Sequence, residues 1–223
     1  MTATAHPIDA VIFDFGGVFT ESPLTQFAAF ESQHGLPARF LASVIKARMD
    51  DGAFSQFERG ELDLDTFDRA FLAETTAAGH PVAGRALMDL LSLPLRDGMV
   101  QAHAQLVSRG VKTGCITNNT PGSTASDWVE ADQRGDVARV FDRFEVVLES
   151  ATVGLRKPEP AIYTLMCERL GVEPTRCVFL DDLGVNLKPA RQLGMHTIKV
   201  PLTHWQTALD ALEAVLGYAV RDA

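Results

Sequence analysis

Two apolar runs that each end abruptly in carboxylates constrain the fold of this chain more than any other feature. The first is Val11–Phe13, followed by Asp14, and the second is Cys177–Leu180, followed by Asp181 and Asp182. Such runs are typical of buried parallel strands, and open α/β sheets bind ligands beyond the carboxyl ends of their strands. If the two strands are neighbours, the three carboxylates repel one another unless a cation neutralises them. Magnesium suits such an all-oxygen site, so the pattern predicts a metal centre and a candidate nucleophile.

Length, charge and cysteine content narrow the class of protein. The 223 residues suffice for one domain, or for one domain with an insertion. The formal charge of −9 argues against nucleic acids and anionic membranes as partners. Residues 1–8 lack a signal-peptide pattern, and no apolar stretch approaches the roughly 18 residues of a membrane span. Cys115, Cys167 and Cys177 show no CxxC spacing, so we expect reduced thiols in a cytoplasmic protein.

Strand and helix patterns alternate through most of the chain, which is typical of an α/β fold with a parallel sheet. Each helical pattern between the strands stops at a glycine, as helices commonly do. The expected strands are Ala10–Asp14, Val111–Thr117, Phe144–Leu148, Cys177–Asp181 and His196–Val200. The expected helices among them are Asp97–Arg109, Pro160–Leu170, Asn186–Leu193 and Thr203–Leu216.

The stretch from residue 21 to residue 95 carries helical patterns and no strand pattern. Ser22 and Pro23 suit the N-cap and the first position of a helix, and Asp63 or Asp65 suits the N-cap of a later one. We therefore predict a helical cap inserted after the first strand, lying over the strand ends as a lid. The expected domains are a core of residues 1–20 and 96–223 and a cap of residues 21–95.

Residues near two other predicted strand and helix ends could bind an anion. Thr117 and Asn118 could donate hydrogen bonds to a phosphate oxygen, although an N-cap for the next helix also explains them. Lys157 is held before a predicted helix, where it could neutralise both a carboxylate nucleophile and a transferring phosphate. A solvated loop cation is the alternative, and Arg156 is the better candidate for that role.

Residues flanking the carboxylates could support the site. Gly16 and Gly17, after Asp14, allow the backbone to approach a bound anion closely. Asn186, four residues after Asp182, suits the N-cap of the following helix, or it holds Asp182 or its loop in place.

In order and spacing, these sites resemble the four motifs of the haloacid dehalogenase-like (HAD) hydrolase superfamily, subfamily I, across the whole chain. Residues 153–163 and 177–194 and the Thr117–Asn118 step closely resemble the N-terminal phosphatase domain of soluble epoxide hydrolase. The resemblance implies a Rossmann-like parallel sheet of strand order 3-2-1-4-5, with all four motifs at one edge. It also implies that the helical cap chooses the substrate.

The same resemblance implies a magnesium-dependent phosphatase acting on a small phosphorylated metabolite. Asp14 would be the nucleophile, forming an aspartyl-phosphate that water then hydrolyses. Lys157 would be the second catalytic residue. Magnesium would be held by Asp14, the backbone carbonyl of Gly16 and Asp182, with Asp181 in support. Thr117, Asn118 and Lys157 would bind the phosphate, and Gly17 would let the backbone approach it closely.

Gly16 departs from the family pattern. Phosphatases of this superfamily usually carry a second aspartate at this position, which protonates the leaving group and activates the water. General acid–base help is worth about 10²–10⁴-fold, so we expect its loss to slow the enzyme without necessarily silencing it. Substitutes that the sequence offers are Glu21, Glu61, Asp63 and His34.

Two other functions compete with the phosphatase. One is a 2-haloacid dehalogenase, which also lacks the second aspartate but usually has an aromatic residue there and needs no metal. Gly16 and the epoxide-hydrolase-type segments disfavour it. The other is a non-catalytic phospho-ligand or protein-binding module, in which Gly16 marks lost chemistry. The sequence does not give the substrate, because cap packing shapes the pocket, and a homodimer is compatible with it.

Overall fold

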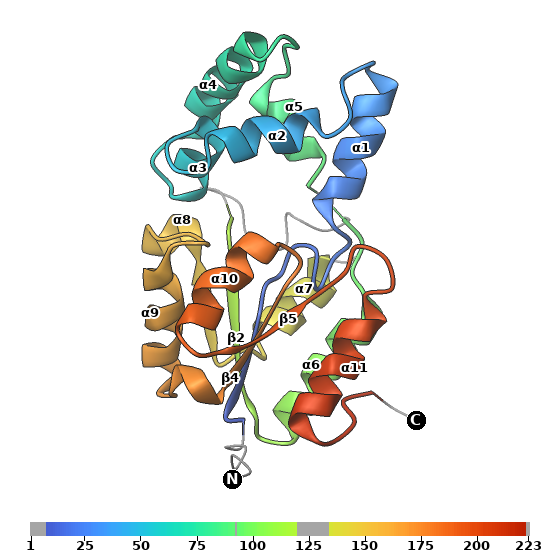
Figure 1. Ribbon diagram of the computed structural model, residues 1–223, viewed down its shortest axis with the longest axis vertical. Coiled ribbons are helices and arrows are strands. Elements are labelled where there is room, and N and C mark those ends of the chain that lie inside the picture. Colours follow the sequence, from blue (N-terminus) through green and yellow to red (C-terminus); the bar gives the residue numbers. More distant parts are fainter. Residues whose placement is uncertain (1–7, 92, 120–133, 222–223) are drawn as a thin grey trace.

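A parallel sheet with helices on both faces forms the lower part of the molecule, and a group of helices lies above it (Figure 1). The computed structural model describes residues 8–91, 93–119 and 134–221. The strands are β1 (Ala10–Phe13), β2 (Lys112–Thr117), β3 (Val146–Glu149), β4 (Cys177–Asp181) and β5 (His196–Lys199). All pairings are parallel, in the order β3-β2-β1-β4-β5. This confirms the predicted sheet, with strand ends shifted by one or two residues.

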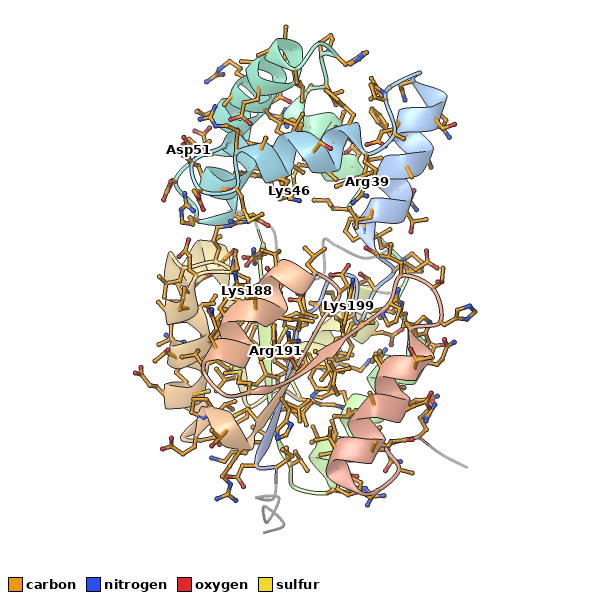
Figure 2. All side chains as sticks on the ribbon, in the orientation of Figure 1. Arg39, Lys46, Asp51, Lys188, Arg191 and Lys199 are labelled. Carbon is orange, nitrogen blue, oxygen red and sulfur yellow. The ribbon has the colours of Figure 1, made fainter. Side chains whose placement is uncertain are left out.

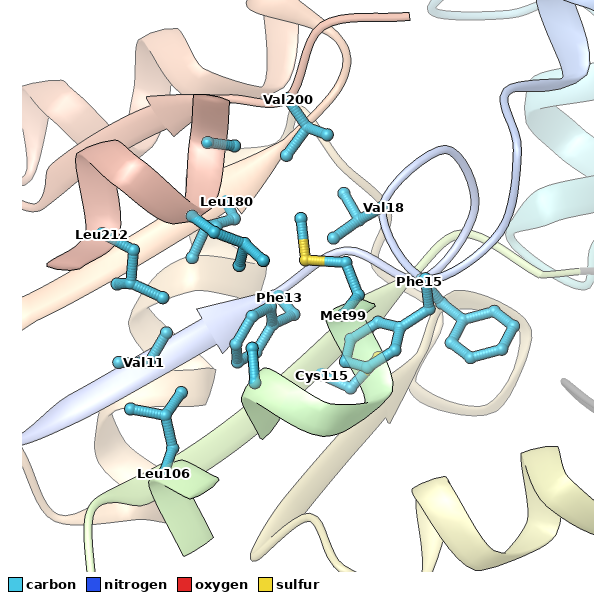
Figure 3. Close-up of a cluster of buried hydrophobic side chains, with 14 of the residues drawn as sticks. Val11, Phe13, Phe15, Val18, Met99, Leu106, Cys115, Leu180, Val200 and Leu212 are labelled. Carbon is cyan, nitrogen blue, oxygen red and sulfur yellow. The ribbon is translucent and has the colours of Figure 1, made fainter. Parts of the chain in front are cut away.

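The central strand β1 is apolar on both sides because helices cover both faces of the sheet. Val11 and Phe13 pack with Leu106 and Leu212 against α6 (Asp97–Ser108) and α11 (Gln206–Leu216), together with α7 (Arg134–Phe141) (Figure 3). The alternate residues Ala10 and Ile12 pack against α9 (Pro160–Leu170) and α10 (Gly184–Gln192). Fully burying one large apolar side chain contributes about 1.5–3 kcal/mol, so this two-sided core holds the strand ends firmly in place.

The predicted helices of this part are found, with two corrected starts. Gly110, Gly171, Gly194 and Gly217, the expected stops, all have positive φ angles. Helix α11 begins at Gln206 rather than Thr203, and α10 begins at Gly184 with Leu183 at its N-cap. The predicted N-cap role of Asn186 is therefore wrong. Its side chain bonds to Asp181 instead, as described below.

Five helices form a separate lobe around their own apolar cluster. They are α1 (Pro23–Gln33), α2 (Phe40–Ala47), α3 (Ala53–Glu58), α4 (Leu64–Ala77) and α5 (Gly84–Asp89), and we call them the α1–α5 lobe. The cluster is rich in phenylalanine and includes Phe27, Leu41, Phe57, Phe67, Phe71 and Leu87. Pro23 opens α1 as predicted, and the Asp63 carboxylate accepts a hydrogen bond from the backbone N–H of Thr66 at the start of α4.

Two neighbouring chain segments connect this lobe to the sheet. Thr20 and Leu95 form an antiparallel bridge, and the backbone N–H of Arg96 donates to the carbonyl of Phe19 over 2.7 Å. The lobe lies over the carboxyl ends of the strands, with α3 beside the short helix α8 (Ser150–Val153) (Figure 1). Of the described helices, none has the length and hydropathy that crossing a membrane requires.

Candidate active site

Three carboxylates meet where β1 and β4 end. In the parallel register Phe13 pairs with Leu180, so the next residues, Asp14 and Asp181, emerge side by side. Asp14, Asp181 and Asp182 each offer an oxygen, and these atoms lie within 4.8 Å of one another. All three residues are buried. The spatial cluster predicted from the two apolar runs is thus present.

Lys157 reaches this cluster from the segment before α9. Its Nζ lies 2.5 Å from Asp14 Oδ1 and 3.0 Å from Asp181 Oδ2, and the residue is only 1% exposed. Burial alone lowers the pKa of Lys157, but the two carboxylates raise it above its usual value, so the ammonium stays charged. The solvated-loop alternative is wrong for Lys157 and also for Arg156, which is buried and forms an ion pair with Glu58.

The electrostatics of the cluster favour a divalent cation. Burial raises the pKa of Asp14 well above its usual range, the Lys157 ammonium opposes this, and the neighbouring aspartates add to it. Burial also raises the pKa of Asp182 to about 6, with Asp181 contributing. The Lys157 ammonium and the Arg96 guanidinium, which acts on Asp182, do not neutralise three buried carboxylates, and the donors are all oxygen. This donor set therefore fits a magnesium ion.

Asp181 and Asp182 are engaged very differently. Both oxygens of Asp181 accept hydrogen bonds from Asn186 Nδ2 over 3.0 Å, and its Oδ1 also accepts one from the backbone N–H of Leu183. Among the described residues, Asp182 accepts only the hydroxyl of Ser22, over 2.9 Å. Asn186 therefore holds Asp181, not Asp182 as one reading of the sequence had it. Asp182 keeps oxygen lone pairs free for a metal.

This difference predicts distinct consequences for two neighbouring substitutions. We expect Asp182→Ala to weaken magnesium binding more than Asp181→Ala, because Asp182 has the freer carboxylate. Asp181→Ala should instead lower the melting temperature more, because it removes one of the two carboxylates paired with Lys157 and the acceptor of the buried Asn186 amide. Magnesium titration calorimetry and thermal unfolding of both variants measure the two effects. Equal effects, or the reverse order, would contradict this division of roles.

The two glycines after Asp14 differ in what they tolerate. Gly16 has no positive φ, and a Cβ built there meets no atom within 4 Å. Gly17 has a φ of +76°, and a Cβ there would lie 2.4 Å from Asp182 Oδ2. A glycine at position 17 is thus needed for the close approach of its backbone to the Asp182 carboxylate. Its backbone N–H donates to the hydroxyl of Thr20, which leaves the predicted anion-binding role of Gly17 without a free donor.

The end of β2 faces Lys157. Asn118 donates from Nδ2 to the Lys157 carbonyl over 3.0 Å and accepts the Lys157 backbone N–H at Oδ1 over 2.9 Å. The Asn118 side chain therefore fastens the lysine segment. Thr117 is buried at the strand end, and its hydroxyl has no hydrogen-bond partner within the described part of the chain. The N-cap alternative concerns a helix after Asn119 and lies outside the described residues.

Three of the four candidate substitutes for the missing acid are engaged elsewhere. Glu61 pairs with Arg59, Asp63 caps α4, and the His34 ring bonds to the carbonyl of Phe30. Glu21 is exposed. Sequence reasoning missed the buried pair of Glu58 and Arg156. Nothing in the sequence signals it, because its partners are 98 residues apart.

Comparison with known proteins places this geometry in a family. A family model described as haloacid dehalogenase-like hydrolase matches residues 8–194. Phosphatase MT3486 of Mycobacterium tuberculosis is 36% identical over 211 residues, which is 86% of this chain and 87% of that protein. Mouse acyl-CoA dehydrogenase family member 10 is 35% identical, and pig bifunctional epoxide hydrolase 2 is 34% identical. These two matches cover 94% and 93% of this chain. They cover only 19% and 39% of the two longer relatives.

Solved structures share the fold. An L-2-haloacid dehalogenase from Xanthobacter autotrophicus superposes with a TM-score of 0.58 at 23% identity, over 94% of this chain and 83% of that one. A HAD family enzyme from Bacteroides thetaiotaomicron, in complex with magnesium and inorganic phosphate, gives 0.57 at 20% identity, over 88% and 96%. At these identities the likeness concerns the fold alone. The family model, which matches residues 8–194, shows that this chain belongs to the haloacid dehalogenase-like hydrolases.

Proposed function

We propose that this protein is a magnesium-dependent phosphatase that hydrolyses a small phosphorylated metabolite through an aspartyl-phosphate. In this proposal residues 21–95 are a cap over a catalytic core of residues 1–20 and 96–223. The observation that carries it is the contact of Lys157 Nζ with Asp14 Oδ1 inside a buried carboxylate cluster. The similarity to Phosphatase MT3486 supports the reaction type.

The residues divide the work by position. An Asp14 oxygen attacks phosphorus, the bond from phosphorus to the leaving oxygen breaks, and water later cleaves the acyl phosphate and restores the carboxylate. Lys157 neutralises charge on Asp14 and on the transferring phosphate, and the Thr117 hydroxyl donates to a phosphate oxygen. Asp14, the Gly16 carbonyl and Asp182, with Asp181 behind them, would hold magnesium, which supplies charge neutralisation and orientation of the phosphate.

Basic side chains on both sides of the lobe boundary support an anionic substrate. Figure 2 shows Arg39 and Lys46 on the lobe and Lys188 and Lys199 on the sheet side. All four residues are exposed and form no ion pair with another described residue. In a chain of net charge −9, such local cations favour the approach of a phosphate ester.

A cytoplasmic location is also part of the proposal. Cys115, Cys167 and Cys177 are all buried free thiols. Buried unpaired cysteines suit a reducing compartment, where disulfides rarely persist.

A substrate screen tests the reaction type directly. Aryl, acyl, sugar and lipid phosphates and short 2-haloacids are incubated with the full chain, with magnesium or with a chelator. We expect magnesium-dependent release of phosphate, fastest from aryl and acyl phosphates, and no halide release. Halide release without metal would identify a dehalogenase, and no turnover of any compound would favour the binding module. Either result would refute the phosphatase proposal.

A further inference from the structure

A buried ion pair joins the α1–α5 lobe to the sheet. Glu58, the last residue of α3, accepts hydrogen bonds at Oε2 from Arg156 Nε over 2.9 Å and from Arg156 Nη2 over 2.5 Å. The two side chains are only 7% and 8% exposed. Arg156 Nη1 also donates to the carbonyl of Met49, in the loop before α3, over 3.0 Å. A guanidinium held at three donors has a fixed orientation.

A second contact of the same helix end uses backbone and hydroxyl groups. The fully buried Ser150 hydroxyl donates to the Glu58 carbonyl over 2.5 Å and accepts the backbone N–H of Asn119 over 3.0 Å. Gly60 comes so close to the sheet side that a Cβ there would lie 2.9 Å from the Ala151 carbonyl oxygen. Thus α3 docks on α8, which lies just below it in Figure 1, and Ser150 links the end of α3 to Asn119, two residues after β2.

The docking partners on the sheet side are the immediate neighbours of the phosphate-binding candidates. Arg156 precedes Lys157, and Asn119 follows Asn118, whose side chain bonds both backbone polar groups of Lys157. Burial raises the pKa of Glu58, and the charges of Arg156 and Lys157 oppose this shift. The carboxylates Asp14, Asp181 and Asp182 are fixed instead by the ends of β1 and β4.

We propose that Glu58 and Arg156 are positioning residues: docking of α3 through this pair sets the Lys157 segment and Asn118 for binding the phosphate group. The proposal deepens the proposed phosphatase function and rests on it. A buried ion pair contributes little net stability against an apolar replacement. Its geometric precision, however, is what a site that binds a tetrahedral anion requires, since misplacement by about 1 Å can cost 10²-fold.

Glu58→Gln and Arg156→Gln test this in the full chain. We expect each to raise the Kd of inorganic phosphate for the magnesium-loaded protein by about 10-fold or more, with a matching rise in KM for an aryl phosphate. Magnesium affinity should change less than about 2-fold, because the proposed metal ligands lie at the ends of β1 and β4 rather than on α3. Calorimetry with magnesium, and then with phosphate on the magnesium-loaded protein, measures both.

The neighbouring pair of Arg59 and Glu159 supplies a matched control. This pair also joins the α1–α5 lobe to the sheet side, with Arg59 Nη1 lying 3.4 Å from Glu159 Oε1. Its side chains, however, are 15% and 37% exposed. Arg59→Gln should therefore leave the Kd of phosphate within about 2-fold of the wild-type value. If Glu58→Gln does not fold, Ser150→Ala is used in its place. This variant removes the hydroxyl that links the C-terminal end of α3 to Asn119, and it leaves no charge unpaired.

The outcomes separate positioning from other roles. A lower melting temperature with unchanged Kd and KM would mean that the pair is merely structural and would overturn the proposal. A steeper dependence on leaving-group pKa at unchanged phosphate affinity would make Glu58 a proton donor and would also overturn it. Failure of the phosphatase proposal is recognised separately, because the wild-type protein would then turn over no phosphate ester at all.

Discussion

Replacing Asp14 by asparagine should lower the turnover of an aryl phosphate by about 10³-fold or more, because it removes the nucleophile of a covalent mechanism. Asparagine has nearly the same shape, and its oxygen can still accept the Phe15 backbone N–H that Asp14 Oδ1 now accepts. Steady-state kinetics at saturating magnesium measures the loss. Retention of most of the activity would exclude an aspartyl-phosphate.

Thermal unfolding of the same variant provides the control. Asp14 carries a raised pKa because burial and the two neighbouring aspartates disfavour its charge. Asp14→Asn removes one of three repelling carboxylates, while Lys157 keeps Asp181 at 3.0 Å as its partner. In the metal-free protein we therefore expect Asp14→Asn to be at least as stable as the wild type. An inactive variant that is also stable localises the defect to chemistry rather than folding.

Gly16→Asp should raise hydrolysis of alkyl phosphates by up to about 10²-fold, because it restores a general acid beside the nucleophile. Alkyl phosphates leave as strongly basic alkoxides and need a proton, whereas aryl and acyl phosphates need one far less. The rate should consequently depend less steeply on leaving-group pKa than in the wild type. A series of aryl and alkyl phosphates of graded leaving-group pKa measures that slope.

The structure makes this substitution a clean test. Position 16 has open space for a Cβ and an ordinary φ, whereas position 17 has neither. Gly16→Ala is the matched control, since it adds the Cβ without the carboxyl group and should leave the slope unchanged. A shallow slope already present in the wild-type protein would mean that another residue supplies the acid, and Gly16→Asp would then add little.

Much of the fold and of the candidate site followed from local patterns. Short apolar runs ending in Asp14 and in Asp181–Asp182 predicted parallel strands, and the observed pairing of β1 with β4 brings those carboxylates within 4.8 Å. Lys157 was also selected from the sequence and lies against Asp14. These strands could be predicted because a central parallel strand is buried on both faces. Its sequence is therefore a continuous run of apolar residues.

Contacts between distant segments escaped that reasoning. Arg156 looked like a solvated loop residue, yet it is buried because Glu58, 98 residues earlier, supplies the charge that compensates its burial. Asn186 was compatible with an N-cap or with support of Asp182 or its loop, yet its amide bonds to Asp181 from inside α10. A local sequence window contains neither the partner of such a residue nor the direction in which its side chain points.

The sequence by itself thus determined the parallel strands and the carboxylates at their ends, because hydrophobic periodicity is a property of the chain, whereas the strand order was expected only from the resemblance to the HAD-like hydrolases. Only the tertiary structure decided which of two adjacent glycines can carry a side chain. That choice depends on the φ of Gly17 and on the 2.4 Å between its would-be Cβ and Asp182, and both are set by packing across the sheet. The docking of α3 on the Lys157 segment was decided in the same way, by burial of opposite charges far apart in sequence.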